Sequence, residues 1–84
     1  MEIKVFQKTQ RDLAATINLV IDNYWKDQID EIKMIELIQK LYVTNTNKII
    51  KEGKYTTILR QQCGKRRLDV VSQVLKDTEH ITIV

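Results

Sequence analysis

Apolar residues recur through the first half of the chain at the three- and four-residue spacing of amphipathic helices. This pattern predicts one helix over residues 10–26, after the candidate N-cap Thr9, and a second over residues 31–43, after the candidate N-cap Asp30. The apolar arc of the second helix spans about 220°, which is wider than a surface helix needs. We therefore expect this helix to lie at the centre of the fold or to contact another chain.

The second half of the chain shows shorter patterns separated by polar residues and glycines. The run TNTN is typical of a turn, and a short helix over residues 47–52 would end at Gly53, since glycine accepts positive φ. Two further helices are predicted over residues 57–62 and 65–77, with Gly64 between them.

Both ends of the chain alternate apolar and polar residues, in EIKVF and HITIV, as short strands do. Terminal strands would pair with each other or across a dimer, because an unpaired strand edge favours aggregation. The predicted fold class is therefore mainly α: a compact bundle of four to five helices with a short two-stranded β-ribbon formed by the N- and C-terminal segments. We expect a single domain over residues 1–84.

Composition narrows the chemistry that such a domain could perform. The chain has 84 residues, 43% of them hydrophobic, with no proline, one histidine and one cysteine. We expect no metal site, no cofactor and no enzymatic activity, because nucleotide-binding glycine loops and hydrolase motifs are absent. His80 is interpreted as an exposed polar residue and Cys63 as a small core residue. Without a signal-peptide or membrane-helix pattern, a cytoplasmic location is expected.

Positive charge is concentrated in the C-terminal half. The net charge is +3, whereas residues 48–76 alone carry eight cations and two acids. Three of these cations, Lys65, Arg66 and Arg67, stand at the start of the last predicted helix, where the helix dipole favours an anion. On a helical wheel Arg67 falls inside the apolar arc. We expect its guanidinium to meet a carboxylate or a carbonyl at the edge of the core, while Lys65 and Arg66 face water.

The segment TTILRQQCGKRRLDVVSQVL has the outline of a helix-turn-helix, with a glycine between two helices and cations opening the second. The detail fits poorly. Aligning Gly64 with the usual turn glycine places Arg60 where a small residue normally packs and Arg67 where an apolar residue is expected.

The sequence favours a small non-enzymatic nucleic-acid-binding regulatory protein with a basic C-terminal helical surface. The candidate phosphate contacts are Lys54, Arg60, Lys65, Arg66 and Lys76. A solvated run of charge, with no binding role, explains the same residues about as well.

The alternative function is a protein-interaction module, such as a phage or mobile-element factor that binds and modulates a host protein. Its candidate residues are Tyr24 and Trp25, since aromatic side chains are enriched in interface hot spots. Ordinary core packing is the competing explanation of both. The partners left open are therefore a nucleic acid, a host protein and a second copy of the chain in a homodimer; no membrane partner is expected.

The run CGKRRL at residues 63–68, preceded by YTT at 55–57 and YW at 24–25, resembles a family of small proteins of Gram-positive bacteria and their mobile elements. The similarity covers residues 9–75. That family has no assigned function. The resemblance implies one natural domain and transfers no catalytic or binding residue.

Overall fold

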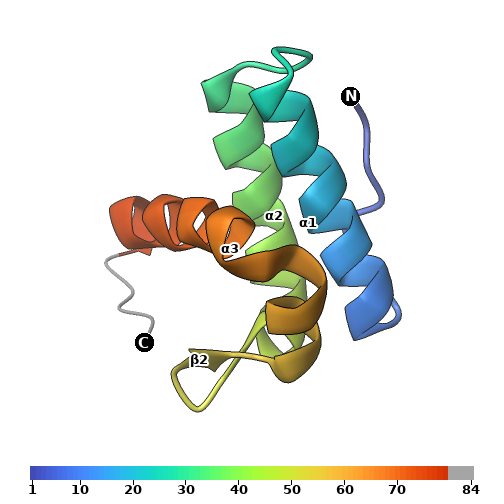
Figure 1. Ribbon diagram of the computed structural model, residues 1–84, viewed down its shortest axis with the longest axis vertical. Coiled ribbons are helices and arrows are strands. Elements are labelled where there is room, and N and C mark those ends of the chain that lie inside the picture. The colour runs from blue at the N-terminus through green and yellow to red at the C-terminus, as the bar shows by residue number, and fades with distance from the viewer. Residues whose placement is uncertain (80–84) are drawn as a thin grey trace.

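The computed structural model describes residues 1–79, which form three helices and one short antiparallel ribbon (Figure 1). None of the described helices is both long enough and apolar enough to span a bilayer. In chain order the elements are α1 (Gln10–Trp25), α2 (Glu31–Ile49), β1 (Ile50–Lys51), β2 (Lys54–Tyr55) and α3 (Thr57–Glu79).

The first two helices lie side by side and begin at the caps that the sequence predicts (Figure 1). The backbone N–H of Asp12 donates to Thr9 Oγ1 at 3.1 Å, and that of Lys33 donates to Asp30 Oδ1 at 2.7 Å. Each cap satisfies one N–H that has no partner within the helix. Both predicted N-caps are therefore confirmed, and α1 ends one residue before its predicted end.

The core lies where α3 crosses the α1–α2 pair (Figure 1). Its fully buried members come from all three helices and include Leu13, Ile17, Leu41, Leu59 and Val71. The apolar arc of α2 is buried in part: Met34, Leu37, Ile38 and Leu41 lie in the core, and α2 contacts both α1 and α3, whereas Ile32 at its N-terminal end is 77% exposed.

The ribbon contributes Tyr55 to this core. Its hydroxyl lies 2.7 Å from Ser72 Oγ and 3.3 Å from the carbonyl oxygen of Leu68, both in α3. Burial raises the pKa of Tyr55 to about 12, so the phenol stays neutral at physiological pH. The ribbon is thereby attached to the last helix.

The prediction of four to five helices is wrong. The run TNTN does not separate two elements: α2 continues through it to Ile49, with a break at Asn45, and no helix extends over residues 47–52. Side chains in this run bond back to the helix: Thr46 Oγ1 donates to the carbonyl oxygen of Tyr42 at 2.6 Å, and Asn45 Nδ2 donates to that of Leu41 at 2.9 Å. Bonds from side chains to carbonyls four residues earlier often accompany a bend in a helix, and here they lie at the break at Asn45.

The two predicted helices of the C-terminal half correspond to the two parts of α3. These parts meet at Gly64, whose φ of 80° and ψ of 167° are not helical, and α3 turns sharply there (Figure 1). Gly64 is the only non-helical residue within α3. The turn of three or four residues that a helix-turn-helix requires is therefore missing at this position.

The predicted ribbon between the chain termini is also wrong. The observed ribbon is a hairpin in which Ile50 faces Tyr55 and Lys51 faces Lys54. Its turn residues Glu52 and Gly53 have φ values of 55° and 76°, the two positive angles of a type I′ hairpin. Gly53 thus closes a hairpin instead of ending a helix. The predicted C-terminal strand and His80 lie outside the described residues.

The N-terminal segment forms no strand because a side chain of α2 takes the place of a strand partner. The backbone N–H of Gln7 donates to Asn45 Oδ1 at 3.1 Å, and Asn45 Nδ2 donates to the carbonyl oxygen of Val5 at 2.8 Å. Asn45 itself is buried and has φ −125° and ψ 30°, outside the helical region. Its amide therefore joins the N-terminal segment to a break in α2.

Candidate functional site

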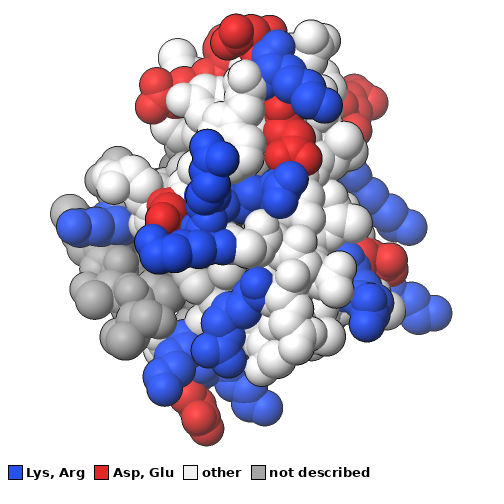
Figure 2. Space-filling view, viewed as in Figure 1, with Lys and Arg blue, Asp and Glu red and all other residues white. Residues whose placement is uncertain are grey.

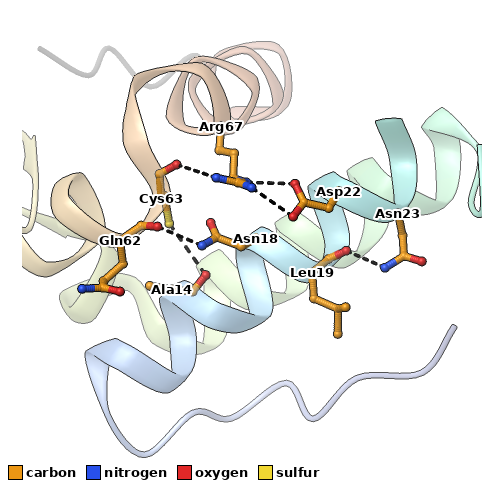
Figure 3. Close-up of polar contacts among 8 residues, drawn as sticks. All are labelled: Ala14, Asn18, Leu19, Asp22, Asn23, Gln62, Cys63 and Arg67. Carbon is orange, nitrogen blue, oxygen red and sulfur yellow. Dashed lines mark hydrogen bonds and ion pairs between the residues drawn. The ribbon is translucent and has the colours of Figure 1, made fainter. Parts of the chain in front are cut away.

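The bend of α3 at Gly64 meets α1 through a set of polar contacts (Figure 3). Because Gly64 leaves the helical conformation, the carbonyls just before it need partners other than helix N–H groups. Asn18 Nδ2 donates to the carbonyl oxygen of Gln62 at 2.9 Å, and Arg67 Nη1 donates to that of Cys63 at 3.2 Å. Side chains from α1 and from the next turn of α3 therefore complete the helix end.

Arg67 also makes a two-pronged ion pair with Asp22 of α1. Nε lies 2.9 Å from Oδ1 and Nη2 lies 3.0 Å from Oδ2, with both side chains about one-third exposed (Figure 3). Hydrogen bonds from Arg67 hold the pKa of Asp22 below its usual value, although partial burial opposes this. The sequence predicted that the guanidinium of Arg67 would meet a carboxylate or a carbonyl at the edge of the core. This prediction is confirmed, and Arg67 binds one acceptor of each kind.

Cys63, whose carbonyl accepts from Arg67, has a buried side chain. Its thiol lies 3.7 Å from the carbonyl oxygen of Ala14, and burial raises its pKa to about 11. A thiol that stays protonated at neutral pH is a poor nucleophile. The interpretation of Cys63 as a small core residue is confirmed.

The two cations before Arg67 remain at the surface. Lys65 Nζ lies 3.1 Å from Asp69 Oδ2, in a pair whose side chains are 89% and 64% exposed. The guanidinium of Arg66 lies 5.4 Å from the centroid of the Trp25 ring, within the range of cation–π contact. Three successive cations thus have three different roles.

The predicted phosphate contacts are all exposed, but they form separate groups. Lys54 and Arg60 line a hollow of about 340 Å³ between the hairpin and the start of α3. Lys51, which was not among the predicted phosphate contacts, lines the same hollow. Lys65 and Arg66 lie at the bend, and Lys76 follows Arg66 by ten residues, about 15 Å along the helix.

Figure 2 shows one face on which lysine and arginine side chains gather over α3 and the hairpin. Acidic side chains are few there and gather at the end of the molecule that carries the α1–α2 turn. We call the exposed cations of the hairpin, of the start of α3 and of its bend the basic face: Lys51, Lys54, Arg60, Lys65 and Arg66.

The predicted protein-interaction residues, Tyr24 and Trp25, line one apolar groove of about 310 Å³. Trp25 is 43% exposed, so it is not an ordinary core residue, whereas Tyr24 is half-buried. The side chains that α2 and α3 contribute to the same groove were not predicted from the sequence. The lining of this Trp25 groove is completed by Glu31, Met34, Ile35, Val70, Gln73 and Val74.

Over residues 1–79, fold and surface together define a small three-helix unit with a hairpin before its last helix, a basic face and an apolar groove. The chain belongs to the family CLB_0814_fam, described as conserved hypothetical protein, whose family model matches residues 4–76. This membership agrees with the family resemblance seen in the sequence and transfers no function. No curated protein and no solved structure gives a significant match.

Proposed function

We propose that the protein is a small non-enzymatic regulator that binds nucleic acid through the basic face. The observation that carries the proposal is the gathering of exposed cations over the hairpin and the bend of α3, with few acids among them (Figure 2). A nucleic acid gains most of its affinity for such a surface from phosphate contacts and from release of condensed counterions.

The local contacts of the basic face are compatible with ligand binding. The pair between Lys65 and Asp69 is highly exposed, and pairs of this kind contribute about 0–1 kcal/mol. A phosphate can therefore compete for Lys65. Arg67, in contrast, is held by Asp22 and by the carbonyl of Cys63, so we assign it no contact with ligand.

The test is fluorescence anisotropy with labelled duplex DNA, single-stranded DNA and RNA over a series of salt concentrations. Each lost phosphate contact should lower the slope of log affinity against log salt by about one unit. We expect Lys54→Ala/Arg60→Ala and Lys65→Ala/Arg66→Ala each to lower this slope. The matched control is Lys33→Ala/Lys40→Ala, which removes two cations that pair with Glu36 on α2. Absence of binding at low salt, or equal slopes for all variants, would refute the proposal.

A second candidate function is a module that binds a host protein. It is favoured by the Trp25 groove and by the exposure of Ile32, which follows the lining residue Glu31 in sequence and is 77% exposed. Pull-down from a host lysate with wild type and Trp25→Ala would test it. The control is Leu19→Ala, which changes another exposed apolar residue of α1. Equal yields of the same proteins with all three baits would count against this candidate. Light scattering at high concentration separately tests the homodimer.

A further inference from the structure

Trp25 belongs to two neighbouring features of the surface. Arg66 of the basic face lies over its ring at 5.4 Å, and Arg67 approaches the same ring at 5.9 Å. The same indole lines the apolar groove between α1, α2 and α3. A ligand in the groove would therefore touch an aromatic ring and lie beside the exposed guanidinium of Arg66.

The shape and lining of the groove suit one planar base. Its volume of about 310 Å³ is at the lower end of the range for small-molecule sites, and a nucleobase is smaller than most such ligands. Met34, Ile35 and Val70 supply apolar contact, and Glu31 is the acidic residue of the lining. A carboxylate can accept a hydrogen bond from the exocyclic amino group of a base.

We propose that the nucleic acid bound by this protein is single-stranded, with one unpaired base against Trp25 in the groove and the adjoining phosphates on Arg66 and Lys65. The inference rests on the proposed function and narrows it. A base within a duplex is paired and stacked, so it cannot enter such a groove, whereas single strands present free base faces to aromatic side chains. Charge complementarity favours this occupant over an apolar peptide, which would leave the adjacent cations unused.

The fluorescence of Trp25 tests the proposal directly, because Trp25 is the only tryptophan of the chain. Wild-type protein is titrated with an unlabelled single-stranded oligonucleotide and with a hairpin duplex of the same length. Affinities for labelled versions of both are measured by anisotropy. We expect the single strand to bind at least tenfold more tightly and to quench the tryptophan emission, since stacking brings a base into contact with the indole ring.

Variants separate stacking from charge. Trp25→Leu should weaken single-strand binding about tenfold, within the range measured for loss of one stacked base, and should leave duplex binding unchanged. Trp25→Phe keeps an aromatic ring and should retain most of the affinity, so it provides the test if Trp25→Leu does not fold. Leu19→Ala, on the same helix, should behave as wild type.

The outcomes distinguish this inference from the function on which it rests. Equal affinity for both nucleic acids without quenching would overturn the single-strand assignment and leave binding by the basic face intact. Single-strand binding that Trp25→Leu and Leu19→Ala weaken equally would also overturn it. Absence of binding to any nucleic acid at low salt would overturn both proposals and favour a protein ligand for the groove.

Discussion

At the breaks in α2 and α3, the hydrogen bonds that stabilise the backbone come from different sources. At Asn45 the residue that leaves the helical conformation supplies its own amide, which bonds within α2 and to the N-terminal segment. At Gly64 the residue has no side chain, and Asn18 and Arg67 supply the missing donors. A polar residue at a break can thus bind a distant segment with its own side chain. A glycine cannot, so the carbonyls at its break need donors from other residues.

The largest loss of stability should come from a change at Asn45, because its amide also binds the N-terminal segment. Asn45→Ala removes the acceptor of the Gln7 N–H and the donor to the Val5 carbonyl, and an unsatisfied buried group costs about 1–3 kcal/mol. We expect the free energy of unfolding to fall by about 3 kcal/mol in urea denaturation. The exposed Asn47→Ala, from the same TNTN run, is the control. Equal stability of the two variants would mean that the amide of Asn45 does not hold the N-terminal segment.

The break at Gly64 should be sensitive to backbone conformation and insensitive to side-chain size. A Cβ at Gly64 would meet no atom within 4 Å, so the cost of Gly64→Ala comes from φ 80° and ψ 167°, a region almost restricted to glycine. We expect a loss of about 2 kcal/mol in thermal or urea unfolding. Gly53→Asn is the comparison, because asparagine tolerates positive φ in a hairpin turn. A thermally silent Gly64→Ala would show that α3 can straighten.

Removing the guanidinium of Arg67, which donates to a carbonyl at the bend, should have a smaller effect on stability. Arg67→Ala loses the bond to the Cys63 carbonyl and the pair with Asp22, which is one-third exposed and therefore screened. We expect a loss of about 1 kcal/mol. Lys65→Ala and Arg66→Ala should each stay within about 0.5 kcal/mol of wild type. Differential scanning calorimetry of the three variants decides whether Arg67 alone is structural; equal shifts in Tm would contradict this division.

Acid should produce the smallest effect, through the same ion pair. The pKa of Asp22 is lowered in the folded state, so the unfolded chain takes up the proton first as pH falls. The contribution of Asp22 is therefore complete above about pH 4, the usual aspartate range, and is lost below it. The stability difference between wild type and Asp22→Asn should shrink as pH falls from 6 to about 2. A difference that does not change with pH would show that the charge of Asp22 contributes nothing.

The features that the sequence predicted correctly depend on near neighbours. Thr9 and Asp30 cap residues three positions away, and Gly64 breaks a helix by its own conformational freedom. The position of Arg67 on the helical wheel sufficed to place it at the core edge, although nothing local identified Asp22, 45 residues away, as its partner.

The missed features depend on distant partners or on very short elements. In the sequence, Asn45 looks like any residue of a polar turn. Its partners, Val5 and Gln7, lie about 40 residues away and contact it only in the folded chain. Strands of two residues are too short to show an alternating pattern in the sequence. Without that pattern, a glycine at position 53 was equally compatible with a helix end and with a hairpin turn. The Trp25 groove was missed in part because α2 and α3 contribute to it only through tertiary packing.

The bond between Tyr55 and Ser72 has a consequence for the motions of the molecule. It joins the hairpin to the part of α3 that follows the bend. Opening of the hairpin therefore requires release of that part of α3, and the two segments should unfold locally as one cooperative unit. Amide hydrogens of Tyr55 and of residues 68–75 should then exchange with solvent at a common rate, distinct from that of the α1–α2 pair.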